Sequence, residues 1–145
     1  LRRDLEARVR GGSLASRVRL HGHVSHARLA ELLADADIFV SPALSDGNNV
    51  SLNEAMACGC LPIATAIPAN AQWIVDGDTG LLYPPGDSTS LAGCIRRAVT
   101  DTDLRRRAAR SNRLVVERRA DWRVCVRTME EVYMRAIERA GAASR

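Results

Sequence analysis

The stretch Asp37–Thr65, "DIFVSPALSDGNNVSLNEAMACGCLPIAT", decides the fold because it alternates strand-like and helix-like patterns. "DIFVSP" is a short apolar run that ends at Pro42, which predicts a strand buried on both faces. Ser51 and Glu54 have the spacing of a capping box, so we expect a helix that starts there and stops at Gly59. "LPIAT" predicts a second buried strand. Strand, helix and strand in this order predict a right-handed βαβ unit with a parallel sheet.

The alternation continues on the N-terminal side of this unit. "RVRLHG" (17–22) predicts a short strand, because Val18 and Leu20 alternate with polar residues. Ser25 stands where an N-cap belongs, and a helical stripe of apolar residues follows it over 29–36.

On the C-terminal side, "NAQWIV" (70–75) predicts one or two helical turns and "GLLYPPGD" (80–87) predicts a last strand. Three helices are then expected, over 89–100, 102–118 and 121–139. The fold class is therefore α/β: a Rossmann-like, doubly wound parallel sheet followed by C-terminal helices.

Composition limits the classes of function. The 145 residues suit one domain, and 46% hydrophobic with 26% charged residues is typical of a globular chain. Aromatic residues make up only 3%, which argues against base stacking, so we expect no nucleic-acid partner. No apolar run approaches the roughly 20 residues of a membrane span. The four cysteines form no CxxC pair, which fits a reducing compartment such as the cytoplasm.

Ligands of open α/β sheets bind beyond the carboxyl ends of the strands. Three loops follow predicted strands, over 21–26, 41–51 and 65–72. The second is the most informative, because it is polar and runs into a helix N-terminus. Free amides at Val50, Ser51 and Leu52 would form an anion site. Carboxylates near it would suit hydrogen bonds from sugar or ribose hydroxyls, since an ionised carboxylate only accepts.

Two stretches, "SDGNNVSLNEAMACGCLPIAT" and "IPANAQWIVDGDTGLLYPPGD", closely resemble the donor-binding half of family-four (group 1) retaining glycosyltransferases, which have the GT-B fold. The signature of that family is an E-x7-E pair around a glycine-containing loop, then "EAMACG", a strand and "DGxTGLLxPPGD". Flanking segments are also similar, so the resemblance covers residues 17–138. It implies an enzyme that transfers a sugar from a nucleotide-diphospho-sugar to an acceptor with retention of anomeric configuration.

The resemblance also implies roles for particular residues. Glu54 would hold the ribose hydroxyls, and Asp46 would lie near the hydroxyls of the transferred sugar; these are the two candidate catalytic residues. The other candidate substrate-binding residues are Asn48, Asn49, Val50 and Ser51, through backbone amides near the sugar and distal phosphate, and Val24 and His26 beside the nucleobase. No metal or other cofactor is expected, because the nucleotide sugar is itself the donor substrate. Two departures matter: Asp46 replaces Glu, and Asn49 replaces a loop glycine.

The same resemblance places an arginine or lysine diphosphate clamp, the first strands of this domain and the acceptor domain upstream of residue 1. We therefore expect residues 1–145 to be a partial nucleotide-sugar-binding domain, a fragment that is inactive alone. The expected acceptor is a glycan, a lipid-linked molecule or a small molecule. Two alternatives remain: a catalytically idle binding or interaction module with a shortened first carboxylate, and a sugar-nucleotide epimerase of the same architecture.

Each candidate residue also has a purely structural interpretation. Glu54 could serve only the capping box, and Asp46 could be only a turn residue before glycine. The histidines His21, His23 and His26 suggest a metal cluster, but we expect none, because strand alternation separates them and no acidic partner is near.

Two further features have structural interpretations. Cys58 and Cys60 flank a helix stop and are expected to be buried small hydrophobic residues. The arginines at 105–107, 110 and 113 are expected to form a solvated helix face. The alternative is a contact with anionic lipid headgroups, which would place the protein peripherally at the inner face of the membrane.

Overall fold

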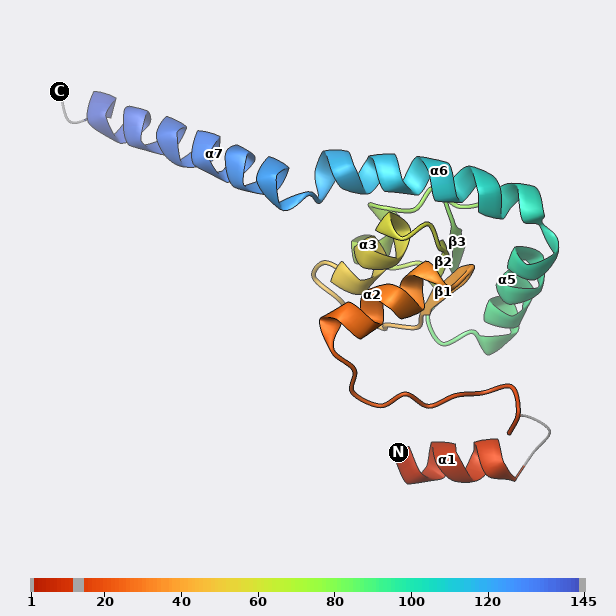
Figure 1. Cartoon of the computed structure of the whole chain (residues 1–145). Helices are drawn as coiled ribbons and strands as arrows, with labels where there is room; N and C mark the ends of the chain where they lie inside the picture. Colours follow the sequence, from red (N-terminus) through yellow and green to blue (C-terminus); the bar gives the residue numbers. More distant parts are fainter. Residues whose placement is uncertain (1, 12–14, 144–145) are drawn as a thin grey trace.

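Figure 1 shows the computed structural model, which describes residues 2–11 and 15–143. In these ranges, helices surround a three-stranded parallel sheet of order β1-β2-β3. The strands are β1 (Ile38–Ser41), β2 (Leu61–Thr65) and β3 (Leu81–Tyr83). Because the strands are parallel, their carboxyl ends meet at one edge of the sheet, as the predicted fold class requires.

β2 is the central strand. Ile38 pairs with Leu61 on one side, and Ile63 pairs with Leu81 on the other. All residues of β2 are buried, which confirms the prediction for "LPIAT". The prediction that β1 is buried on both faces is wrong: β1 is an edge strand of the described sheet, and Val40 is 37% exposed.

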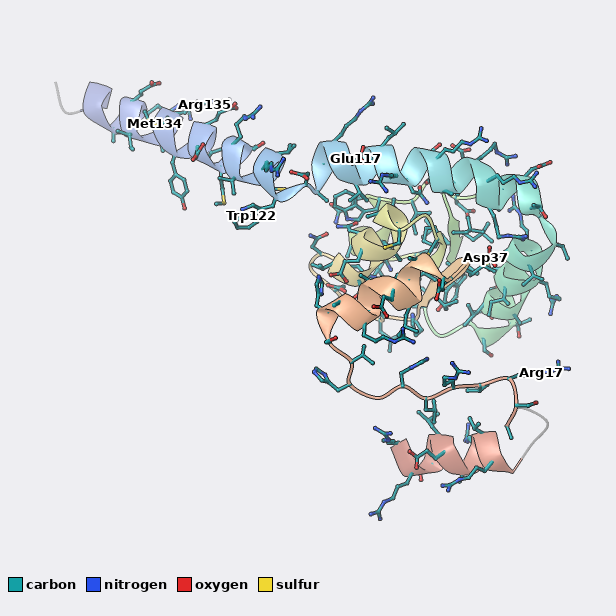
Figure 2. The ribbon with its side chains drawn as sticks, viewed as in Figure 1. Arg17, Asp37, Glu117, Trp122, Met134 and Arg135 are labelled. Atoms are coloured by element: carbon teal, nitrogen blue, oxygen red, sulfur yellow. The ribbon has the colours of Figure 1, made fainter. Side chains whose placement is uncertain are left out.

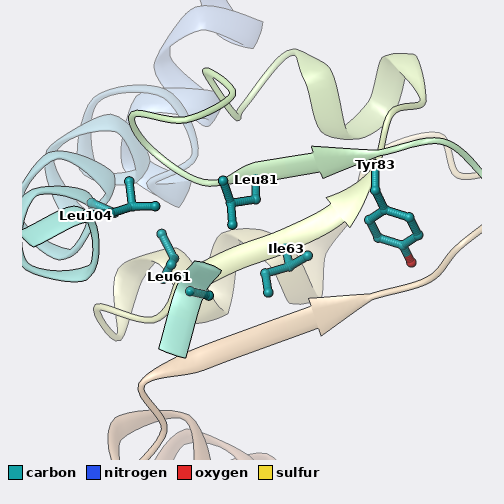
Figure 3. Close-up of a cluster of buried hydrophobic side chains, with 7 residues drawn as sticks. Leu61, Ile63, Leu81, Tyr83 and Leu104 are labelled. Carbon is teal, nitrogen blue, oxygen red and sulfur yellow. The ribbon is translucent and has the colours of Figure 1, made fainter. Parts of the chain in front are cut away.

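Helices cover both faces of the sheet. On the face shown in Figure 3, side chains of β2 and β3 pack against α5 (Ser88–Thr100) and α6 (Thr102–Arg119). This cluster comprises Leu61, Ile63, Leu81, Tyr83, Ala98, Leu104 and Ala108. On the other face, α3 (Val50–Ala57) contributes Leu52 and Met56 to a second cluster with Ala64, Trp73 and Ile74. Successive side chains of a strand point to opposite faces, so β2 serves both clusters.

Local signals set most helix ends. Ser25 Oγ accepts a hydrogen bond from the Arg28 amide, which confirms Ser25 as the N-cap of α2 (His26–Ala34). The Asp87 carboxylate caps α5, and hydrogen bonds from Ser90 lower its pKa. The short helix α4 (Pro68–Ala71) begins earlier than the turns predicted over 70–75.

α5 and α6 match their predicted ranges to within a residue, and α7 (Trp122–Ala143) extends past its predicted end. Figure 1 shows α7 projecting from the body, and Figure 2 shows Trp122 and Met134 clear of the other elements. Trp122 is 77% exposed. No helix in the described ranges is both long and apolar enough to cross a membrane.

The strand predicted over 17–22 is absent. The segment lies between α1 (Arg2–Arg10) and α2 without pairing to any described strand, and Val18 and Leu20 are exposed. Its alternating pattern suits a strand, but a strand also needs a neighbour to satisfy its backbone groups. The loop 21–26 therefore follows no strand, although it leads into α2.

The start of α3 also differs from the prediction. Asn49, not Ser51, is the N-cap: Asn49 Oδ1 accepts from the Leu52 amide at 3.1 Å. Ser51 lies inside the helix, so the capping box of Ser51 with Glu54 is wrong. The predicted stop is confirmed, since Gly59 has a φ of +90° just after the C-cap.

The two cysteines at this helix stop differ in burial. Cys60 is buried as predicted, but Cys58 is exposed, which corrects that prediction. Cys58 is the C-cap residue of α3, and the chain then reverses through Gly59 into the core.

The arginine face of α6 is solvated as predicted, with one exception. The exposed members are Arg106, Arg107, Arg110 and Arg113. Arg105 instead is half-buried, and its Nη1 donates to the carbonyls of Ala98 and Val99 at the end of α5, at 2.5 and 2.7 Å. It therefore satisfies carbonyls that the helix end leaves free.

We predict opposite effects for two glycine substitutions. A Cβ at Gly80 would lie 2.7 Å from the Pro62 carbonyl oxygen, so Gly80→Ala should lower the free energy of unfolding by about 1–3 kcal/mol. A Cβ at Gly93, inside α5, would have only an Arg96 side-chain atom near it, at 3.9 Å. Gly93→Ala should therefore raise the free energy of unfolding by roughly 0.5–1 kcal/mol. Urea unfolding measures both, and a Gly80→Ala variant as stable as the wild type would contradict the packing described here.

We also predict selective alkylation. Iodoacetamide at about pH 8 should modify Cys58 and Cys125 and spare Cys60, because burial raises the pKa of Cys60 to about 11 and the thiolate is the reactive form. Mass spectrometry of the digested protein identifies the modified cysteines, and a urea-unfolded sample, in which every cysteine should react, is the control. Equal labelling of Cys58 and Cys60 in the folded protein would disprove the burial of Cys60.

Candidate functional site

The loop between β1 and α3 leaves the carboxyl edge of the sheet. Within it, Asp46 Oδ1 accepts from the Asn48 amide at 3.1 Å, which forms an Asx-turn, and Asp46 is exposed. Asp46 is therefore a turn residue, as one of the two interpretations predicts, but it uses only one of its carboxylate oxygens in the turn. The second oxygen, Oδ2, stays available to a ligand.

The Asn49 side chain is used entirely within the protein. It is 5% exposed, and its Nδ2 donates to Ser41 Oγ and to Asn70 Oδ1, both at 2.9 Å. Its Oδ1 accepts from Leu52, as described above. Only the backbone of Asn49 can then face a ligand, which is the role that the resemblance implies for it.

A buried polar network extends from Asn49 into the sheet. Asn70 Nδ2 donates to the Thr65 carbonyl at 2.9 Å and to Thr65 Oγ1 at 3.1 Å. Thr65 Oγ1 donates in turn to the Ala43 carbonyl at 2.5 Å. The network joins the ends of β1 and β2 to α4. Sequence reasoning missed Ser41, Thr65 and Asn70; the available signal, a polar residue at the end of an apolar run, applies to Ser41 and Thr65.

Two backbone amides at the start of α3 have no acceptor in the described part of the chain. The first turn of a helix has no intrahelical acceptor for its N–H groups, and Val50 and Ser51 are exposed. Leu52 was predicted to complete the set, but its amide is taken by the Asn49 cap. The anion site therefore has two free amides, together with the positive end of the helix dipole.

Glu54 lies one turn further along α3 and is half-buried. Its Oε1 is 3.8 Å from Nδ1 of His26, the first residue of α2. Both residues line a hollow of about 180 Å³ between the two helices, with Leu29, Ala30, Leu33, Ala57 and Cys58. The structure thus brings Glu54 and His26 together. Val24 is half-buried just before α2, and Asp46 lies on the loop, a different element from Glu54.

A second hollow, of about 290 Å³, lies on the α6 side of α3 and includes Asn48, Val50 and Glu54 in its wall. Trp73 Nε1 donates to Asn48 Oδ1 at 3.1 Å, and the Arg119 guanidinium lies 4.5 Å from the Trp73 ring centroid. This geometry is a cation–π contact. Sequence reasoning did not single out Trp73 or Arg119, because their partners are distant in the chain.

Groups that could bind a metal do not gather in the described part of the chain: no three His, Cys, Asp or Glu side chains lie close enough together. His21 and His23 are exposed in the extended segment before α2. The arrangement is therefore one of amides, carboxylates and hydroxyls that can bind a polar ligand through hydrogen bonds.

Comparison with known proteins places these features in a family. The family model described as "Glycosyl transferases group 1" matches residues 1–101. The phosphatidyl-myo-inositol mannosyltransferase of Mycobacterium leprae (strain TN) is 31% identical over 129 residues, which make up 88% of this chain and 34% of that protein. This chain thus spans about one third of the length of that relative.

Solved structures show the same fold. The sucrose-phosphate synthase of Thermosynechococcus elongatus matches with a TM-score of 0.84 at 30% identity, over 94% of this chain and 34% of that one. Anabaena HepE, solved in complex with UDP and glucose, matches with a TM-score of 0.80 at 23% identity, over 91% and 36%. These neighbours have the GT-B fold, and the parallel α/β sheet of this chain corresponds to part of it. The chain belongs to the group 1 family of glycosyl transferases.

Proposed function

We propose that this chain is part of a donor-binding domain that binds a nucleotide-diphospho-sugar at the start of α3. The protein would transfer the sugar to an acceptor with retention of anomeric configuration. The observation that carries the proposal is the pair of exposed residues Val50 and Ser51, whose amides have no described acceptor, at the carboxyl edge of a parallel sheet and one turn before Glu54. The complex of Anabaena HepE with UDP and glucose supports a donor of this kind.

The diphosphate would bind at the amides of Val50 and Ser51, with the backbone of Asn48 and Asn49 bordering it. Amides and the positive helix end favour an anion. During transfer the departing diphosphate gains negative charge, and dipoles that are already oriented stabilise that charge without reorganising. Binding and catalysis would therefore use the same groups.

The nucleoside would occupy the hollow between α2 and α3. Glu54 can accept hydrogen bonds from both ribose hydroxyls, because an ionised carboxylate offers two acceptor oxygens. His26 and Val24, at the start of α2, would border the base, and Leu29 provides an apolar wall. The His26 side chain is 82% exposed and so is accessible to a ligand.

Asp46 would orient the transferred sugar through its hydroxyls. Its Oδ1 is engaged by the Asn48 amide, which leaves Oδ2 to accept from the sugar. The rival proposal is an idle binding module, which the shorter Asp side chain and its turn contact favour. The two proposals differ in whether removing the charge of Asp46 lowers turnover.

The acceptor would be a glycan, a lipid-linked molecule or a small molecule, bound mainly by parts of the protein beyond these residues. For a lipid-linked acceptor, the exposed arginines of α6 would face anionic headgroups at the inner face of the membrane; otherwise the protein would work in the cytoplasm.

We expect Glu54→Gln to weaken binding of the donor about tenfold, because a neutral amide is a weaker acceptor for the ribose hydroxyls than a carboxylate. Stability should not change, since Asn49 and not Glu54 caps α3. Calorimetry with UDP-glucose, ADP-glucose and GDP-mannose measures the affinities. Glu31→Gln, an exposed glutamate on α2, is the matched control. Equal affinity of Glu54→Gln and wild type for the donor that binds would exclude the ribose role.

Asp46→Asn should lower the turnover of the full-length protein with little loss of nucleotide affinity. Asparagine keeps the oxygen that accepts from the Asn48 amide, so the turn should persist while the charge is lost. Asp46→Glu should be tolerated, because it restores the length that is usual in the family. Steady-state kinetics with whichever donor binds in the calorimetry provide the test. If Asp46→Asn and Asp46→Ala both turn over like the wild type, Asp46 is only a turn residue.

A further inference from the structure

We propose that Asn70 and Trp73 are positioning residues, which hold the loop 45–50 against the sheet and so fix the direction of the free amides at the start of α3. Neither residue needs to touch the ligand. The consequence for donor binding rests on the proposed function, whereas the effect on the loop itself does not.

Two side-chain hydrogen bonds tie the loop to the rest of the domain, and the first of these ties joins Trp73 to Asn48. Trp73 is 8% exposed, and its ring packs in the cluster that contains Leu52 and Met56 of α3. Its Nε1–H donates to Asn48 Oδ1, and the guanidinium of Arg119 covers the ring. Arg119 is held in turn by a hydrogen bond from its Nη1 to the Gln72 carbonyl at 2.9 Å. The indole is therefore a fixed donor beneath the loop.

The second tie joins Asn70 to Asn49, the next residue of the loop. Asn70 is fully buried, and both acceptors of its Nδ2 belong to Thr65. The side-chain amide is thereby oriented with Oδ1 toward Asn49, where it accepts from Asn49 Nδ2. Turning either amide over would place two donors or two acceptors against each other, so the orientation of the pair is determined.

Both ties come from one short segment, α4 and the turn after it. Hydrogen bonds from the Asn70 amide to the Ile67 carbonyl and from the Ile74 amide to the Asn70 carbonyl make this segment rigid. For the loop to move, the buried Asn49–Asn70 hydrogen bond and the partly buried Trp73–Asn48 hydrogen bond must break together, and a buried group left without a partner costs free energy. The amides of Val50 and Ser51 are consequently preorganised, which favours binding because the protein then loses less freedom.

Three variants break the ties selectively. Asn49→Asp keeps an oxygen to cap Leu52 but cannot donate to Ser41 or Asn70. Trp73→Phe keeps an aromatic ring in the core and removes the Nε1–H donor together with part of the indole. Asn70→Ala removes the side-chain amide whose Oδ1 accepts the hydrogen bond from Asn49. The matched control is Asn112→Ala, since Asn112 is also fully buried and its Nδ2 donates to the Thr79 carbonyl at 2.9 Å, outside the loop.

Hydrogen exchange without any ligand tests the positioning role directly. The amides of Leu52 and Asn53, which donate to the side chain and the carbonyl of Asn49, should exchange at least about tenfold faster in Asn49→Asp, Trp73→Phe and Asn70→Ala, since the loss of one hydrogen bond that holds the loop shifts a local opening equilibrium by roughly that factor. Asn112→Ala should leave these amides at the wild-type rate. Wild-type exchange in the three variants, or equal acceleration in Asn112→Ala, would overturn the proposal. If Asn70→Ala does not fold, Asn49→Asp and Trp73→Phe still test whether the loop is held in this way.

A fluorescence titration separates this proposal from the proposed function. The sequence has two tryptophans, so in a Trp122→Phe background all tryptophan emission comes from Trp73. Titration with UDP-glucose, ADP-glucose and GDP-mannose should change that emission, and Asn49→Asp and Asn70→Ala should weaken binding about tenfold relative to Asn112→Ala. If calorimetry finds no binding of any of the three, the proposed function fails while hydrogen exchange still decides the positioning role. If donor binds equally to all variants, the positioning role fails while the proposed function stands.

Discussion

The side-chain amide of Asn49 is the contact on which the site depends. Its nitrogen links the end of β1, at Ser41, to Asn70 of α4, and its oxygen caps α3. Each of these buried groups would cost about 1–3 kcal/mol if it lost its partner. One residue therefore fixes where α3 begins, how the loop crosses the carboxyl edge of the sheet and which amides remain free. The resemblance to group 1 glycosyltransferases implies a glycine where Asn49 stands, yet the φ of −74° at this residue requires none.

Much of the fold could be predicted because its signals are local. Apolar runs at β1 and β2, separated by a helical segment, were enough to predict the parallel βαβ unit. The cap at Ser25 and the stop at Gly59 depend on neighbouring residues alone, and both are confirmed. A polar loop that enters a helix after a strand is a recognisable pattern in α/β proteins, so the start of α3 could be proposed as an anion site, although its cap was predicted at Ser51 and lies at Asn49.

Features that depend on distant partners could not be predicted. Asn49 and Ser51 are both good N-caps, and the choice falls on Asn49 because its amide also bonds to Asn70, 21 positions away. The alternation over 17–22 suits a strand, but no described strand lies beside it. Trp73 looks like a core residue in the sequence, and only the fold shows that its N–H supports Asn48. The arrangement of a site thus contains information that a pattern of residue types lacks.

We propose above all that a nucleotide-diphospho-sugar binds at the first turn of α3. An NMR titration of the ¹⁵N-labelled chain with UDP-glucose, ADP-glucose and GDP-mannose, read amide by amide, tests it most directly. We expect at least one of these donors to shift the amide resonances of Val50 and Ser51 more than any others, because those N–H groups would bind the diphosphate. Shifts that instead gather on the arginine face of α6, or spectra that no donor changes, would contradict the account.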